Sequence, residues 1–142
     1  MGYGSWFHRH AKRHKKIVDK LLIREFDKNR IIDYFDYENM VKNEPRFCPL
    51  YKKNQKCHEM EHLNCYLCAC PIFRFSDEGI VEKNGLMQMS GCATHRRQGK
   101  LIEAKGQLHQ DCTHCTLPHE RAYIEQVFDT EWLVMMRLCE VE

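Results

Sequence analysis

Apolar residues are scarce in the middle of this 142-residue chain. Between positions 44 and 120, only 14 of 77 residues are Leu, Ile, Val or Phe, whereas the two flanks together hold 18 in 65. A segment with so little apolar surface cannot offset its loss of conformational entropy by burial alone. We therefore expect a second source of stability in this segment, either disulfide bonds or metal ions.

Long apolar runs are missing as well. No run approaches the roughly 18 residues that a membrane-spanning helix needs, so the sequence predicts no membrane span. The first residues are rich in Lys, Arg and His, which argues against a secretory signal peptide and for a cytoplasmic protein. Disulfides are rare in the reducing cytosol, so metal binding is the leading explanation for eight cysteines between positions 48 and 115.

The flanks have the periodicity of helices. Neither Gly nor Pro occurs between Ser5 and Asn43, and apolar residues recur there at helical spacing in two groups, with a break at Asp27 or Asn29. A third helical pattern follows Pro118 and breaks near residues 129–130. The frequent Gly and Pro between 46 and 120 predict loops, turns and short strands, the strands at 71–75, 79–81 and 86–89.

These patterns predict a small α+β or irregular metal-stabilised domain, in which a two-knuckle cysteine-rich centre is flanked by N- and C-terminal helices. Residues 1–43 form a basic amphipathic helical segment, residues 44–120 the cysteine-rich metal-binding core, and residues 121–142 a C-terminal helix that packs on the core.

An internal repeat carries the strongest metal signal. The segments 64–71 and 111–118 both have the pattern Asn/Asp-Cys-x-x-Cys-x-x-Pro. Each Cys-x-x-Cys turn can direct two thiolates to one ion, and two turns complete a tetrahedral site. Asn64 and Asp111 are expected to cap the turns by accepting backbone N–H groups. The predicted ligands of this first site are Cys65, Cys68, Cys112 and Cys115.

The remaining candidates form a second set of possible ligands. Its four members are Cys48, Cys57, Cys70 and His119, a three-Cys, one-His combination that suits zinc. Alternatively, some of these residues bind a single centre and the others pack. Cys92 and His95 lie between the two turns, where we expect packing or exposure rather than ligation. Cys139 is expected to be a core thiol of the terminal helix.

Catalytic alternatives find little support. His58 and His62, with Glu59 between them, match the His-Glu-x-x-His pattern of zinc proteases. That pattern needs a stable helix, and the gap between Cys57 and Cys65 is too short for one. A dithiol redox site in the second turn would need a thioredoxin-type strand–helix unit, which is not predicted. We therefore assign no catalytic residues and favour a non-catalytic module, with the question of enzyme activity left open.

The cysteine motifs resemble those of a known family. Phe47-Cys48-Pro49-Leu50-Tyr51, then Cys57, then the segments 64–71 and 111–119, are similar in order and spacing to the cysteine-rich small domain, a zinc-finger-like family of prokaryotes. The resemblance covers about residues 46–120. It implies a metal-binding role for Cys48, Cys57, Cys65, Cys68, Cys70, Cys112, Cys115 and His119. It implies little about activity, and the helical flanks lie outside the family pattern.

The metal itself has two candidates. Zinc, as one or two ions, is the default for paired Cys-x-x-Cys turns with a nearby histidine. A [4Fe–4S] cluster is the alternative, because seven thiols are available and Cys70-Pro71 resembles the end of a ferredoxin motif. The spacing from Cys68 to Cys70 is one residue shorter than that motif requires.

A basic run at residues 8–16, beside Trp6 and Phe7, raises the question of partners. Residues 1–30 carry a local charge of +6. Such a helix can bind nucleic acid, but it can equally be a solvated face or complement an acidic protein. We expect a protein partner or a homo-oligomer formed through the helical flanks, and keep nucleic-acid binding through residues 8–16 as the alternative.

Overall fold

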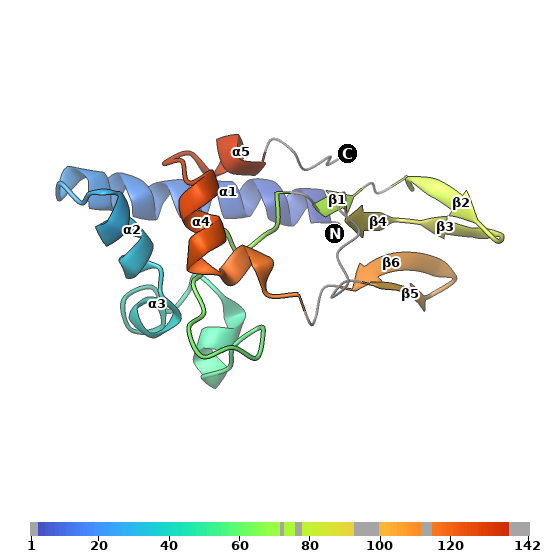
Figure 1. Cartoon of the computed structure of the whole chain (residues 1–142), viewed down its shortest axis with the longest axis horizontal. Coiled ribbons are helices and arrows are strands. Elements are labelled where there is room, and N and C mark those ends of the chain that lie inside the picture. Colours follow the sequence, from blue (N-terminus) through green and yellow to red (C-terminus); the bar gives the residue numbers. More distant parts are fainter. Residues whose placement is uncertain (1–2, 72, 76–77, 93–99, 112–114, 137–142) are drawn as a thin grey trace.

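The computed structural model describes residues 3–71, 73–75, 78–92, 100–111 and 115–136 (Figure 1). The helices are α1 (Tyr3–Ile23), α2 (Lys28–Tyr34), α3 (Tyr37–Asn43), α4 (Arg121–Val127) and α5 (Trp132–Met135), with 3-10 turns η1 (Pro49–Lys53) and η2 (Leu117–His119). The strands are β1 (Phe73–Phe75), β2 (Val81–Lys83), β3 (Leu86–Gln88), β4 (Ser90–Cys92), β5 (Lys100–Ala104) and β6 (Gln107–Asp111). The chain thus has an α+β fold, as the sequence predicts.

The helical N-terminal flank is interrupted where the sequence indicates, and again between Tyr34 and Tyr37, a second break that separates α2 from α3 and was not predicted. Asp27 is the N-cap of α2, and its carboxylate accepts a 2.9 Å hydrogen bond from the backbone N–H of Arg30. Such a side-chain acceptor satisfies one of the free N–H groups of the first helical turn. The C-terminal break is also confirmed, since α4 ends at Val127 and α5 begins at Trp132.

The strands form two small sheets. Strands β1 and β4 pair with each other, and the second sheet has the order β2-β3-β6-β5, in which only β3 and β6 run parallel. Asn84-Gly85 and Lys105-Gly106 turn the β2–β3 and β5–β6 hairpins, and all four residues have positive φ, as two-residue hairpin turns require. Strands β1 to β3 lie within two residues of the predicted positions, whereas the sequence analysis missed β4, β5 and β6.

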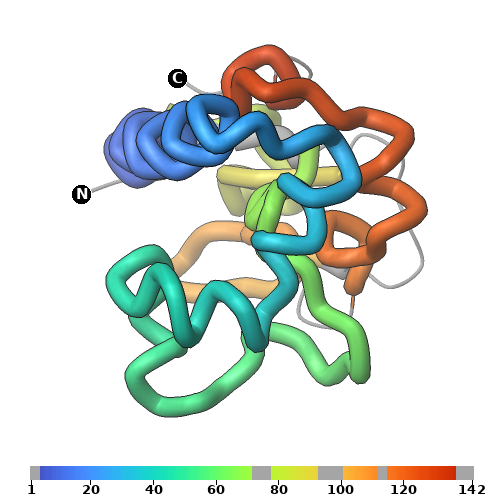
Figure 2. Tube along the Cα trace, turned by 90° about the vertical axis from the view of Figure 1, so that its left-hand side faces the viewer, coloured from blue at the N-terminus to red at the C-terminus, as the bar shows by residue number. Residues whose placement is uncertain are grey.

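One hydrophobic core joins the two helical flanks to the first half of the centre. Trp132 of α5 packs its ring 4.7 Å from that of Phe7 in α1, and its Nε1–H donates a 2.7 Å hydrogen bond to the carbonyl of Leu67. The same core buries Tyr66 and Phe35, whose rings lie 4.9 Å apart. Figure 2, a view from one end of the molecule, shows the green trace around residues 65–70 in the middle of these elements.

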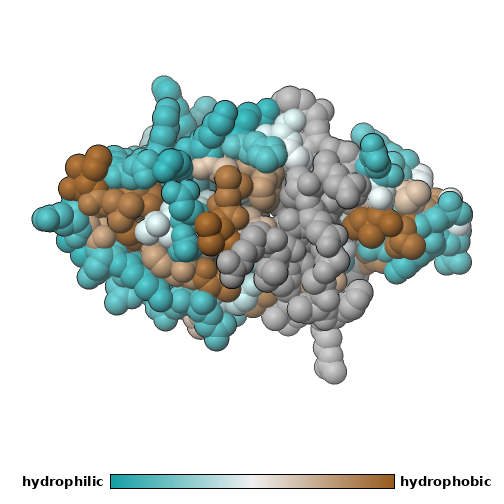
Figure 3. All heavy atoms as spheres, turned by 90° about the horizontal axis from the view of Figure 1, so that it is seen from above, coloured by the Kyte–Doolittle hydropathy of each residue, from teal (hydrophilic) through white to brown (hydrophobic). Residues whose placement is uncertain are grey.

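The four-stranded sheet projects from one end of the molecule (Figure 1). It leaves apolar side chains in solvent, among them Val81 at 45% exposure and Ile102 at 40%. Apolar atoms are visible on this projecting end in Figure 3. None of the helices in the described part of the chain combines the length and apolar character that crossing a membrane requires.

Candidate metal centre

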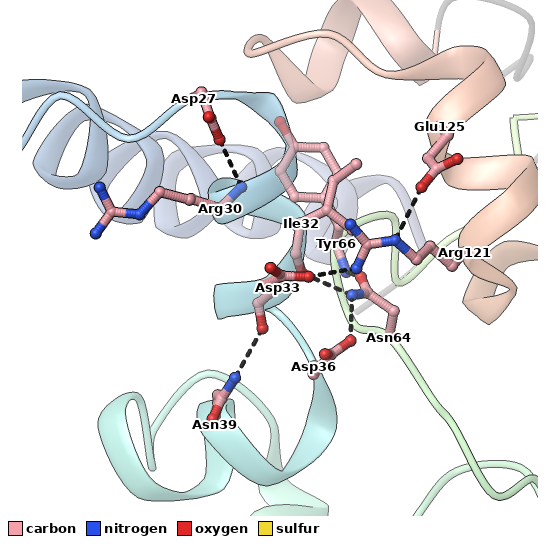
Figure 4. A network of polar contacts seen from close by, with 10 residues as sticks. All are labelled: Asp27, Arg30, Ile32, Asp33, Asp36, Asn39, Asn64, Tyr66, Arg121 and Glu125. Atoms are coloured by element: carbon pink, nitrogen blue, oxygen red, sulfur yellow. Dashed lines mark hydrogen bonds and ion pairs between the residues drawn. The ribbon is translucent and has the colours of Figure 1, made fainter.

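The first Cys-x-x-Cys turn is held in place by Asn64 (Figure 4). The Asn64 amide donates to the carbonyl of Ile32 at 2.7 Å and to Asp36 Oδ1 at 2.8 Å. Its Oδ1 accepts a 2.8 Å bond from the backbone N–H of Tyr66, which confirms the predicted cap. Because the buried amide uses both donor hydrogens and its oxygen, it fixes the start of the turn against the end of α2.

Backbone hydrogen bonds reinforce this attachment. The N–H of Cys65 donates to the carbonyl of Phe35 at 2.8 Å, and the N–H of Tyr37 donates to the carbonyl of Leu63 at 2.9 Å. The turn ends at Cys68, which has a left-handed φ of 56°. This conformation is costly for a residue with a Cβ and persists where the surroundings enforce it, often at functional sites.

His119 is oriented by the backbone carbonyl of Asn64. It ends η2, where Pro118 occupies the first turn, and its side chain is buried. Its Nδ1 lies 2.8 Å from the backbone carbonyl of Asn64, and a carbonyl only accepts, so Nδ1 carries the proton. The lone pair is therefore on Nε2, which lies 3.3 Å from the Sγ of Cys57.

Cys57, His58 and His119 form a group that could hold a metal ion. Their ligand atoms all lie within 4.8 Å of one another, and His58 Nδ1 is 3.2 Å from Cys57 Sγ. Burial lowers the pKa of His119 to about 4, so the imidazole is neutral at physiological pH, as a ligand must be. Cys57 has solvent access, yet partial burial, followed by the Cys48 thiolate, raises the pKa of its thiol.

Further thiols gather around this group. Burial raises the pKa of Cys65 to about 12, and the nearby thiolates of Cys57 and Cys48 add to the increase. Burial likewise raises the pKa of Cys68 well above its ordinary value, with contributions from Cys65, Cys48 and Cys57. The thiols of Cys57, Cys65 and Cys68, whose pKa values are all raised, would become stable thiolates beside a cation. The donor set therefore fits a soft divalent metal or an iron–sulfur cluster.

The described residues bring together members of both predicted ligand sets. Cys48 and Cys57 of the second set contribute to the raised thiol pKa values of Cys65 and Cys68 of the first. Cys115 is buried and Cys70 is half-buried, but neither belongs to the described Cys-His-His group. Cys112 lies outside the described residues, so the division into two four-ligand sites stays a prediction.

The weaker candidates lie either on a strand or outside the described residues, or lack the helix that their motif requires. Cys92 is half-buried on β4, while His95 and Cys139 lie outside the described residues. His58 and His62 do not share a helix, since residues 57–62 are not helical, which agrees with the rejection of a protease motif.

No role at this centre was predicted from the sequence for His58 or Tyr51. His58 joins Cys57 and His119, and the Cys-His dipeptide was the available signal. Tyr51 is buried beside the thiols: burial, and then the thiolate of Cys65, raises the pKa of its hydroxyl. Tyr51 lies in η1, three residues after Cys48, and only the folding of the chain brings it close to Cys65.

The basic run at residues 8–16 is divided between core and surface. His10 and His14 are buried among aromatic rings, and burial lowers their pKa values to about 3 and about 4. His14 Nε2 donates a 2.9 Å hydrogen bond to the carbonyl of Tyr66. Lys15 pairs with Asp19 and with Glu131. The helix therefore does not present its whole basic run to solvent.

The chain matches no protein-family model, no curated protein and no solved structure in three comparisons with known proteins. The resemblance to the cysteine-rich small domain rests on the motifs in the sequence.

Proposed function

We propose that this protein is a metal-binding, cysteine-rich module without a catalytic role, in which zinc stabilises the centre. The orientation of His119 carries the proposal. Its Nδ1–H is bonded to a backbone carbonyl and its free Nε2 faces Cys57 Sγ at 3.3 Å. Metal-bound histidines in proteins almost always donate their second ring nitrogen in this manner.

The proposed ligands are those that the motifs indicate. Cys65, Cys68, Cys112 and Cys115 would bind one zinc ion, and Cys48, Cys57, Cys70 and His119 a second. Mixed nitrogen and sulfur donors are typical of structural zinc sites. Membership of the cysteine-rich small domain family is part of this proposal, and so is a cytoplasmic location, because oxidation to disulfides would remove the thiolate ligands.

Metal analysis tests the proposal directly. Anaerobically purified protein is expected to contain zinc at one or two ions per chain, and His119→Ala and Cys57→Ser to lose the same ion. His62→Ala is the matched control, since the His62 side chain is 92% exposed and outside the predicted ligand sets. Unchanged zinc content in the His119 and Cys57 variants would show that these residues are not ligands.

An iron–sulfur cluster is the second candidate, favoured by the raised thiol pKa values of Cys57, Cys65 and Cys68, to which neighbouring thiolates, Cys48 among them, contribute. It predicts a brown, oxygen-sensitive protein with iron, acid-labile sulfide and an absorption band at about 400 nm. A colourless protein with stoichiometric zinc would exclude it.

We further propose that the helical flanks dock a partner protein or a second copy of the chain. Leu133 and Val134 on α5 are 49% and 41% exposed, and they lie next to the buried Trp132. Light scattering at several concentrations tests self-association, and Leu133→Ser should shift a dimer toward monomer. Nucleic-acid binding remains the alternative, tested by salt-dependent binding to mixed RNA or DNA.

A further inference from the structure

A cleft opens between α1 and the segment that follows α3. It has a volume of about 490 Å³ and is lined on the α1 side by Arg13, Lys16 and Ile17, and on the other side by residues 44–47. Ligand-binding clefts in proteins commonly range from about 300 to 1,000 Å³. The cleft thus has the capacity for a small organic ligand.

The charges in this cleft are unbalanced. Arg13, Lys16 and Arg46 supply three cations, and none of them forms an ion pair with a described residue. Glu44 is the only acidic residue in the lining, and its carboxylate already accepts hydrogen bonds from Lys20 and from the hydroxyl of Tyr34. None of these three cations therefore has an ion-pair partner in the described part of the chain.

Arg13 has a free hydrogen-bonding group as well as a free charge. Its Nε is buried and has no hydrogen-bond partner among the described residues, while its Nη2 lies 3.4 Å from His10 Nδ1. A buried donor without an acceptor is uncommon in native proteins, and either an ordered water or a bound ligand can supply the missing acceptor. Guanidinium groups match the oxygens of phosphates in geometry as well as in charge.

The walls of the cleft are partly apolar. Ile17 and Phe47 are both buried core residues whose side chains reach the cleft, and Pro45 lies at its rim. A free inorganic ion would not use these surfaces, whereas the ring or hydrocarbon part of an organic ligand would cover them.

We propose that this cleft binds a phosphorylated small molecule, with its phosphate on Arg13, Lys16 and Arg46 and its organic part on Phe47 and Ile17. An extended nucleic acid fits less well, because the basic run lacks a continuous exposed track: His10 and His14 are buried. A phosphate monoester carries about −1.5 to −2 charges at neutral pH, which suits three cations better than a carboxylate does.

The cleft lies beside the metal centre but does not depend on it. Phe47 precedes Cys48 in the chain, and Arg13 is close enough to Cys68 to oppose the rise in its thiol pKa. A ligand in the cleft would therefore lie next to the thiol cluster. The binding groups themselves are side chains of α1 and of residues 45–47 and include none of the proposed metal ligands.

Calorimetry and NMR on the full-length, metal-loaded protein test the proposal with phenyl phosphate, inorganic phosphate, benzoate and phenol. We expect phenyl phosphate to bind most tightly, inorganic phosphate and benzoate more weakly and phenol not at all, and we expect phenyl phosphate to shift the Arg13 Nε–H resonance. Lys16→Ala and Arg46→Ala should each weaken phenyl phosphate at least about tenfold, the loss of one charge-assisted contact.

Lys12→Ala is the matched control, because Lys12 is an exposed cation of the same helix outside this cleft. It should leave phenyl phosphate binding unchanged. Absence of phenyl phosphate binding at millimolar concentration, or equal losses in the Lys12 and Lys16 variants, would overturn the proposal. If a single-stranded RNA binds and Lys12→Ala weakens it as much as Lys16→Ala, with no effect of Arg46→Ala, the helix is a nucleic-acid surface instead. Zinc content of each variant separates a lost anion site from a lost metal site.

Discussion

Two halves of the cysteine-rich centre lie in different surroundings: residues 47–67, and the strands of the described residues 81–92 and 100–111. In the first half Phe47, Leu63 and Leu67 are buried against α1, α2 and α5. In the second half the strands of the projecting sheet leave Val81 and Ile102 exposed at 45% and 40%. Both halves are poor in apolar residues, yet only one of them belongs to the core.

This difference shows how an apolar-poor segment can acquire a core. The flanking helices contribute most of the buried apolar surface around the first half, including Trp132, Phe35 and Leu21. The second half relies on hairpin turns and strand pairing. We infer that the first half is stabilised by packing and metal together, and that the second half contributes little to global stability.

Metal removal should produce the largest difference in stability between the two halves. Structural zinc supplies on the order of 10 kcal/mol of folding free energy, comparable to the whole stability of a small domain. Chelation, or Cys65→Ser, is therefore expected to unfold the first half. Hydrogen exchange should show lost protection at the N–H groups of Asn64 and Cys65, which are hydrogen-bonded to His119 and Phe35.

Cys92→Ser provides the control for this experiment, since Cys92 is outside the predicted ligand sets. It should retain metal and protection. Equal loss of protection in β5–β6 and in residues 63–67 after chelation would mean that the two halves unfold as one unit. Full protection of residues 63–67 in the metal-free protein would show that metal does not stabilise this segment.

Removing the packing should have the next largest effect. Trp132→Ala is expected to lower the free energy of unfolding by about 3–5 kcal/mol, because it leaves a cavity and deprives the Leu67 carbonyl of its donor. Trp132→Phe should recover part of this loss. Urea unfolding measures both, with exposed Leu133→Ala as a control expected to stay within about 0.5 kcal/mol. An effect at Trp132 as small as the one expected at Leu133 would mean that α5 does not belong to the core.

Acidification should destabilise the hydrophobic core through the protonation of His10 and His14 on α1. Their pKa values fall from 6.5 to about 3 and about 4 on folding, so both are neutral when folded. Stability is therefore complete above pH 6.5 and declines as the pH drops toward 4, by up to about 1.4 kcal/mol per pH unit for each histidine. His14→Gln, whose amide can still donate to the Tyr66 carbonyl, should reduce this slope.

Thermal unfolding between pH 7 and pH 5, with zinc in excess, measures the slope for each variant. His62→Gln is the control, since that side chain is 92% exposed, and its slope should equal that of the unmodified protein. A His14→Gln variant with an unchanged slope would contradict neutral burial of His14.

Changes on the projecting sheet should matter least. Ile102→Thr replaces a partly exposed side chain on β5 by another β-branched residue, so we expect a change within about 0.5 kcal/mol in urea unfolding. A loss above about 2 kcal/mol would show that this face is covered, which would make it an interface and weaken the contrast between the halves.

Local signals in the sequence predicted much of the fold. Helical periodicity, the Asp27 cap and the break near residues 129–130 located the helical flanks, although the break between α2 and α3 was not predicted, and Asn64 caps its turn as expected. Strands β5 and β6 were missed because they are rich in charged and polar residues. The Lys105-Gly106 turn between them lacks the Asn or Asp that usually marks such a hairpin.

The sequence predicted Cys57 and His119 of the described Cys-His-His group as ligands, but did not include His58. Spacing identifies which cysteines can reach a common ion within one turn, such as Cys65 and Cys68. It does not determine which distant thiols join them, and the proximity of Cys48 and Cys57 depends on how the segment after α3 folds back. His58 was set aside because a protease motif was the only pattern in which it had a role.

The sequence by itself determined the helical flanks and the capped first knuckle, and it nominated the cysteines and His119 as candidate metal ligands, because these depend on periodicity and on short spacings. Only the tertiary structure decided that His119 meets Cys57, that His10 and His14 enter the core, and that Arg13, Lys16 and Arg46 line one cleft. Each of these depends on contacts between segments distant in the chain, which form when α1, the centre and α5 bury their apolar surfaces together.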